Sequence, residues 1–111
     1  MHEMALTQDI VEICERNAGG RPVTLVVLEV GELSGVVPEA VAFCFEACCA
    51  GTVVAGAKLR IVSMAGRGRC LDCRHEQPLE RLFDPCNRCG SFRSEVLIGK
   101  EVRVREIEVA D

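Results

Sequence analysis

Residues 70–89 read CLDCRHEQPLERLFDPCNRC, and the two Cys-x-x-Cys pairs in this stretch decide the fold. Cys70 and Cys73 form the first pair, Cys86 and Cys89 form the second, and residues 74–85 separate them. Each Cys-x-x-Cys turn directs two sulfur atoms at one point, so two turns supply the four thiolates of a closed tetrahedral zinc site. A single pair also occurs in dithiol redox proteins. We therefore predict that these four cysteines bind structural zinc, in a module with few apolar residues that depends on the metal to fold.

The residues around this module predict an α+β fold. Apolar residues of the first segment recur at helical spacing, Gly19 and Gly20 stop that helix, and Pro38 suits the first position of a second one. Three segments rich in Val, Leu and Ile have the character of strands. The expected elements are helices over 4–18 and 38–50 and strands over 23–30, 57–64 and 101–109. The strands on either side of the module are expected to pair as a hairpin from which it projects.

The expected organisation is therefore a domain of residues 1–66 and 94–111 with the cysteine module, 67–93, inserted into it. The final strand changes its apolar parity near Arg105 and Glu106, which predicts a bulge or bend there. Apolar residues make up 49% of the 111 residues, enough for one core. No apolar stretch approaches ~18 residues, so we expect no transmembrane helix.

Charge and aromatic content argue against a nucleic-acid binder. The formal net charge is −4, Trp and Tyr are absent, and there are four Phe. The first residues lack the basic cluster of a secretory signal, so the eight cysteines are expected in a reducing, cytoplasmic compartment rather than in disulfides. We find no set of nucleophile, base and orienting residue and no phosphate loop, so we expect the chain not to be an enzyme.

Four further cysteines, one histidine and the module's arginines have more than one interpretation. The cysteines most simply fill the core, although two of them stand four residues apart on a helix and could chelate a metal. His75 could tune or replace a zinc ligand, but four thiolates already complete the shell. The arginines either contact an acidic partner or form a solvated surface. The residues in question are Cys14, Cys44, Cys48, Cys49, His75, Arg67, Arg69, Arg74, Arg81, Arg88 and Arg93.

The amino-terminal residues form a second candidate metal site. The α-amine of Met1, the His2 imidazole and the backbone nitrogens of His2 and Glu3 could close small chelate rings around one ion. Nitrogen-rich, near-planar coordination suits Ni(II) or Cu(II) rather than zinc. The first N–H groups of a helix that starts near Met4 have no intrahelical acceptor and stay available. The alternative is that His2 is an ordinary mobile terminal residue.

Taken together, these features resemble the HypA/HybF family of hydrogenase nickel-incorporation proteins, in order and over the whole length. The stretches that carry the resemblance are Met1-His2-Glu3, residues 28–36 (LEVGELSGV), Pro38-Glu39-Ala40, the two Cys-x-x-Cys pairs and residues 106–109 (EIEV). The double cysteine pair occurs in many families, whereas its combination with the terminal Met-His-Glu is far more specific.

The resemblance implies a small α/β domain of two helices and a three-stranded sheet that binds nickel, with an inserted zinc domain. It implies transient binding of Ni(II) by His2, helped by Met1 and Glu3, and its delivery to the [NiFe]-hydrogenase large-subunit precursor together with the nucleotide-hydrolysing protein HypB. Some members carry a histidine beside each cysteine pair; His75 matches the first, and Gly90 stands in the place of the second. The chain is expected to be a monomer or a homodimer, with no nucleic-acid or membrane partner.

Two alternatives to a nickel carrier stay open. The first is a zinc-ribbon protein that binds RNA or DNA through the arginines of the module, which a salt-dependent nucleic-acid affinity would reveal. The second is a dithiol redox protein that uses one Cys-x-x-Cys with a lowered thiol pKa. Zinc content distinguishes the second alternative, because four metal-bound sulfurs leave no exchangeable dithiol.

Overall fold

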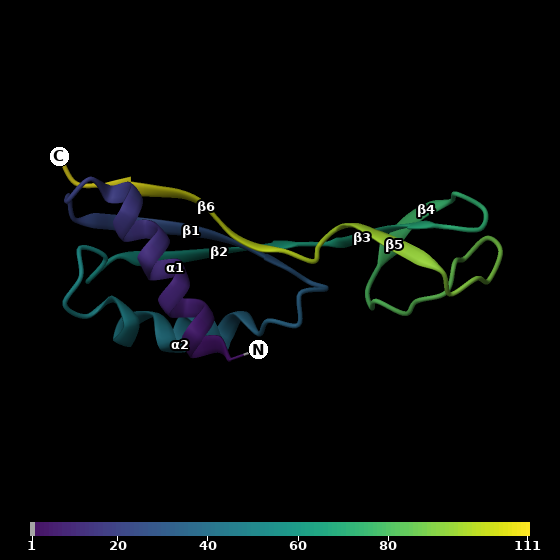
Figure 1. Cartoon of the computed structure of the whole chain (residues 1–111), viewed down its shortest axis with the longest axis horizontal. Helices are drawn as coiled ribbons and strands as arrows, with labels where there is room; N and C mark the ends of the chain where they lie inside the picture. Colours follow the sequence, from purple (N-terminus) through teal and green to yellow (C-terminus); the bar gives the residue numbers. More distant parts are fainter. Residues whose placement is uncertain (1) are drawn as a thin grey trace. The chain divides into compact units, whose positions relative to one another are not determined.

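The structure is a computed structural model that describes residues 2–111, and Figure 1 labels its two helices and six strands. In chain order these elements are α1 (Glu3–Ala18), β1 (Val23–Gly31), α2 (Pro38–Cys49), β2 (Lys58–Met64), β3 (Gly66–Cys70), β4 (Glu76–Leu79), β5 (Ser94–Ile98) and β6 (Val102–Val109). The α+β class with two helices and a small three-stranded sheet is confirmed. Within the described residues, no helix is long and apolar enough to cross a membrane.

The chain divides into two compact units. The first holds both helices and consists of the residues up to Glu29 together with Val36–Val62 and Arg103–Asp111. The second consists of Val30–Gly35 and Ser63–Val102. The second unit contains the module predicted at 67–93 and extends beyond it on both sides.

The first sheet has the order β2-β1-β6, so β1 is its central strand. From Val26 onward every residue of β1 is buried. This matches the sequence, in which apolar residues occupy both the odd and the even positions of the strand, as expected for a central strand covered on both faces. The strands before and after the cysteine module, β2 and β6, flank β1 rather than pairing with each other. The predicted hairpin is therefore wrong, because β1 takes up one edge of each strand.

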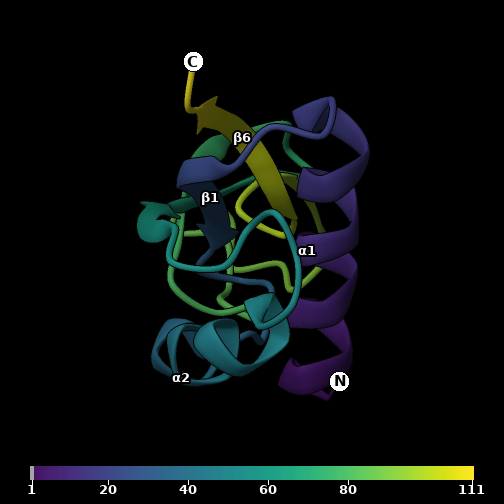
Figure 2. The same cartoon turned by 90° about the vertical axis from the view of Figure 1, so that its left-hand side faces the viewer.

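Both helices bury one face in the core of the first unit. The buried residues of α1 are Thr7, Ile10, Val11, Cys14 and Ala18, and those of α2 are Val41, Phe45 and Cys49. Gly19 ends α1 in the left-handed conformation, as expected for a helix stopped by glycine. The two helices pack against each other, and Figure 2 shows the first turn of α1 beside α2.

A charged cluster joins the central strand to β6. The Glu29 side chain on β1 is only 9% exposed; it accepts a hydrogen bond from Arg103 Nε at 2.6 Å and forms an ion pair with Arg105 Nε at 3.1 Å. The hydrogen bond from Arg103 holds the pKa of this carboxyl below its usual value. The sequence did not predict this ion pair, because residue patterns do not show that β1 and β6 are neighbours in the sheet.

The second sheet has the order β4-β3-β5, with β3 antiparallel to both neighbours. The segment 30–35 joins this unit by backbone hydrogen bonds: Gly31 N–H donates to Glu101, Glu32 N–H to Met64, and Leu33 N–H to Gly99, all at 2.8–2.9 Å. No side chain fits at Gly31, because a Cβ there would lie 2.1 Å from the Gly99 oxygen. This sheet presents the two cysteine pairs.

Candidate metal centre

The first cysteine pair forms a tight turn at the end of β3. Cys70 N–H donates to the His75 carbonyl at 2.8 Å, and Arg74 N–H donates to the Cys70 carbonyl at 2.9 Å. These bonds fold residues 70–75 back on themselves and bring the sulfurs of Cys70 and Cys73 to the same side. Arg74 has φ 68°, the one positive φ among the described residues other than glycine.

The second pair repeats this turn. Cys86 N–H donates to the Ser91 carbonyl and Gly90 N–H to the Cys86 carbonyl, both at 2.8 Å. Gly90 has φ 79°, so it takes the left-handed position that Arg74 occupies in the first turn. The residue equivalent to His75 is therefore Ser91.

The two turns bring all four cysteine sulfurs together. The Sγ atoms of Cys70, Cys73, Cys86 and Cys89 lie within 4.8 Å of one another. Across the two turns, Cys70 Sγ is 3.6 Å from Cys89 Sγ, and Cys73 Sγ is 3.6 Å from Cys86 Sγ. Four sulfurs bound to one zinc ion at ~2.3 Å lie about 3.8 Å apart, so the cluster fits zinc.

Backbone N–H groups favour the thiolate form of the first cysteine in each turn. The Cys73 N–H lies 3.5 Å from Cys70 Sγ and is the main cause of the lowered pKa of Cys70. The Cys89 N–H acts in the same way on Cys86, whose pKa falls to about 6. A metal must bind thiolates, so these N–H groups reduce the free energy needed to deprotonate Cys70 and Cys86.

Gln77 holds the second turn in place, a role that the sequence did not reveal. This side chain on β4 is buried; its Nε2 donates to the Pro85 carbonyl at 3.0 Å, and its Oε1 accepts from Asn87 N–H at 2.8 Å. It therefore ties β4 to the residues on either side of Cys86. A lone Gln between Glu76 and Pro78 has no pattern that could have indicated this contact.

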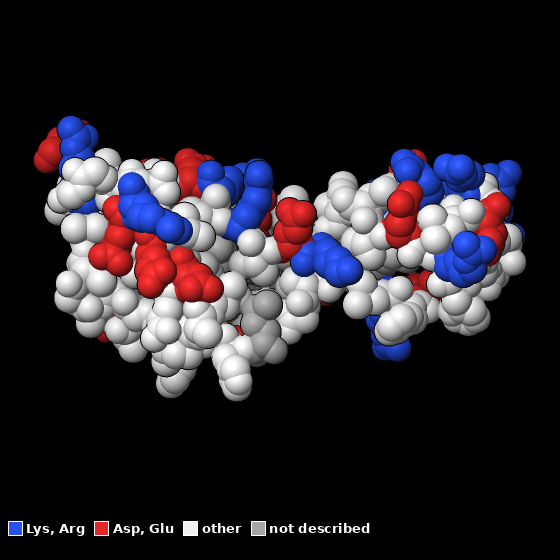
Figure 3. Space-filling model, viewed as in Figure 1, with Lys and Arg blue, Asp and Glu red and all other residues white. Residues whose placement is uncertain are grey.

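Two of the arginines around the cysteine module form ion pairs with acidic residues of the second unit. Arg69 forms ion pairs with Glu76 at 3.3 Å and with Glu95 at 3.0 Å, and Arg93 pairs with Asp72 at 2.7 Å. Figure 3 shows Lys and Arg side chains interspersed with acidic ones over this unit. On the face shown, the charged side chains form a mixed-charge surface rather than a continuous basic one.

The predicted nickel ligands lie at the start of α1. His2 is exposed and occupies the N-cap position, and its carbonyl accepts from Leu6 N–H at 3.1 Å. Glu3 is the first helical residue, so the N–H groups of His2 and Glu3 precede the first intrahelical donors. Met1 lies outside the described residues. Among residues 2–111, the metal-ligand cluster of four cysteines includes neither His2 nor His75.

The remaining cysteines fall into two groups. Cys14 and Cys49 are buried, which confirms that they fill the core. Burial, with a smaller effect of nearby Cys14, raises the pKa of Cys49 to about 11, so it stays a thiol. Cys44 and Cys48 are only half-buried.

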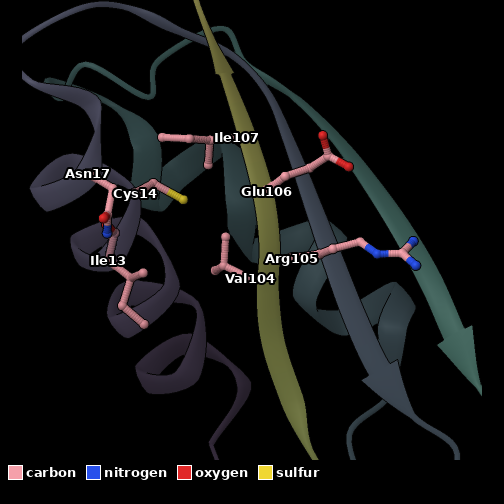
Figure 4. A pocket seen from close by; sticks show the side chains of 7 residues that line it. All are labelled: Ile13, Cys14, Asn17, Val104, Arg105, Glu106 and Ile107. Atoms are coloured by element: carbon pink, nitrogen blue, oxygen red, sulfur yellow. The ribbon is translucent and has the colours of Figure 1, made fainter.

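A small cavity of about 250 Å³ lies between α1 and β6 (Figure 4). Cys14, Val104 and Ile107 point into it, whereas Arg105 and Glu106 point to the other side of β6. Two successive exposed residues at 105 and 106 confirm the predicted change of parity in this strand. The cavity is smaller than the roughly 300–1,000 Å³ of typical ligand pockets, so we assign it no ligand.

These features define a class: a small α+β protein with a four-cysteine cluster in its second unit that fits a metal ion. Residues 1–109 match the family described as hydrogenase/urease nickel incorporation, metallochaperone, HypA. The hydrogenase maturation factor HypA of Geobacter sulfurreducens is 57% identical over 109 residues, which cover 98% of this chain and 99% of that protein. HypA of Rippkaea orientalis is 43% identical over 111 residues, which cover 100% and 97%.

The fold agrees with this relationship. The solution structure of the nickel metallochaperone HypA from Helicobacter pylori matches with a TM-score of 0.72 at 24% identity and covers 98% of this chain and 97% of that one. The chain belongs to the HypA family of nickel metallochaperones for hydrogenase maturation. The family resemblance seen in the sequence is thereby confirmed.

Proposed function

We propose that this chain binds Ni(II) at its amino terminus and delivers it to the [NiFe]-hydrogenase large-subunit precursor, with structural Zn(II) held by Cys70, Cys73, Cys86 and Cys89. The family match over residues 1–109 carries this proposal. It acts as a carrier rather than a catalyst, in the cytoplasm, as a monomer or a homodimer. A HypB-type nucleotide-hydrolysing protein is its partner.

The difference between the two metal sites supports this division of roles. The four sulfurs of the second unit complete a tetrahedral shell and leave no open position, which is typical of structural zinc. His2 is exposed at the start of α1, where a cargo ion has access to solvent. The His2 imidazole and the Met1 amine bind Ni(II) only when deprotonated, so such a site takes up and releases its ion readily.

The ligands at the amino terminus are His2, the Met1 amine and the backbone nitrogens up to Glu3. Nitrogen ligands favour Ni(II) over Zn(II) in intrinsic affinity. The helical backbone does not compete for these nitrogens, because α1 begins at Glu3 and its first N–H groups have no intrahelical acceptor.

The test is a calorimetric Ni(II) titration of the wild type, His2→Ala and a variant with one extra residue before Met1. Both changes should abolish tight nickel binding, because the first removes the imidazole and the second displaces the amine from the chelate ring. Binding should weaken as pH falls from about 7.5 to about 6, where the amine and the imidazole protonate. Zinc content and fold should not change, since His2 is exposed.

Equal nickel affinity in all three proteins would refute the terminal site. The dithiol alternative loses support because all four sulfurs lie in one cluster. The nucleic-acid alternative loses support because Arg69 and Arg93 are paired with acids of their own unit.

A further inference from the structure

Two sulfur-containing side chains meet where the first turn of α1 packs beside α2, and a third lies one helical turn away on α2. The Met4 Sδ on α1 lies 3.3 Å from the Cys48 Sγ on α2. Cys44 precedes Cys48 by one helical turn, a spacing that places the two Cβ atoms about 5–6 Å apart on the same face. Both cysteines therefore lie within reach of one ion beside the Met4 thioether.

These sulfurs are accessible, unlike the other cysteines of the two helices. Met4 is 45% exposed, and Cys44 and Cys48 are half-buried, whereas Cys14 and Cys49 are 0% and 2% exposed. A core filler needs no such exposure. Burial, and to a lesser extent nearby Cys44, raises the pKa of Cys48, so in the absence of a metal this thiol is protonated.

We propose that Met4, Cys44 and Cys48 form a second metal site, selective for a thiophilic monovalent cation, Cu(I). Soft thiolate and thioether ligands select Cu(I). Zinc takes Cys, His and carboxylate ligands, usually four of them, so a set of two thiols and a thioether does not suit it. Binding is a ligand exchange: both thiols release a proton to solvent, two Cu–thiolate bonds form, and the copper stays Cu(I).

This site is separate from the two already described. It shares no residue with the four-cysteine cluster, and its ligands are sulfurs rather than the nitrogens proposed for Ni(II). Met4 stands two residues after His2, so the proposed sulfur ligands and the proposed nitrogen ligands both begin in the first turn of α1.

The test is a titration of the reduced, zinc-loaded, full-length protein with Cu(I), in competition with a colorimetric Cu(I) chelator under anaerobic conditions. A zinc-responsive dye reports any zinc released. We expect one Cu(I) to bind per chain while zinc is retained. Cys48→Ser and Met4→Leu should each weaken Cu(I) binding by at least about tenfold, equivalent to about 1.4 kcal/mol.

Matched controls use a cysteine and a methionine outside the site. Cys14→Ala and Met64→Leu should leave Cu(I) affinity unchanged, and so should His2→Ala, the variant that tests nickel binding. Because Met4 is partly exposed, leucine should be accommodated there without loss of fold. Equal affinity in the wild type and Met4→Leu, or uptake of Cu(I) only with release of an equal amount of zinc, would overturn the proposal.

Discussion

Replacing Gly90 with alanine tests the role of the repeated cysteine turn. Gly90 has φ 79°, and a Cβ added there would meet nothing within 4 Å, so the effect is conformational and not steric. An L residue in the left-handed region is less stable by roughly 1–2 kcal/mol. Alanine also restricts the unfolded chain, which offsets about 0.4–1 kcal/mol of that loss. The net destabilisation should be about 1 kcal/mol.

This loss should be seen in zinc affinity, because folding of the second unit is coupled to metal binding. About 1 kcal/mol corresponds to roughly fivefold weaker zinc binding, measured by competition with a chelator. The matched control is Gly19→Ala, since Gly19 has φ 63° and also has free space, but ends α1 in the first unit. It should lower Tm and leave zinc affinity unchanged. The converse change, Arg74→Gly, should not weaken zinc binding. Wild-type zinc affinity in Gly90→Ala would refute the argument.

Three further changes test the remaining structure. Cys73→Ala removes one of four sulfurs and should abolish zinc binding and expose residues 63–102 to protease while the helical circular dichroism signal persists; full zinc content would contradict this. The lowered pKa of Glu29 means that its carboxylate stabilises the fold above its unfolded pKa and that this contribution is lost as pH falls through the folded pKa. The Tm difference between the wild type and Glu29→Gln should therefore shrink below about pH 4, and a constant difference from pH 7 to 3 would exclude it. Charge reversal at exposed Arg81 and Arg88 should leave the affinity for a HypB-type partner nearly unchanged, because exposed charges mainly alter association rate; a large loss measured by calorimetry would move the interface to the second unit.

The elements that the sequence predicted are those with local signals. Gly19 ends α1 and Pro38 begins α2, in each case because of the backbone conformation that the residue favours. The odd and even positions of β1 are both apolar, which indicates a strand buried on both faces at the centre of a sheet. The cysteine cluster was predictable because ligand spacing is itself local. For these features, the residues that carry the signal are also the residues that form the structure.

The missed features depend on distant partners. Nothing in β3, which reads GRGRC, has the apolar alternation of a strand; hydrogen bonds to β4 and β5 make it one. Gln77 forms hydrogen bonds with the backbone of Pro85 and Asn87, and Glu29 accepts one from Arg103, 74 residues away. The meeting of Met4 with Cys48 likewise requires the packing of α1 on α2.

The segment 30–35 has a consequence for anyone who wishes to excise the zinc-binding part of the chain. Because residues 30–35 and 63–102 together make up the second unit, the polypeptide passes between the units four times rather than twice. A contiguous fragment of residues 63–102 lacks Leu33, a buried residue whose side chain fills the space beside Gly66, and it lacks the three backbone hydrogen bonds of Gly31, Glu32 and Leu33. Such a fragment is therefore not an independent domain. A transplant into another scaffold would have to include residues 30–35 as a second, separate segment of chain.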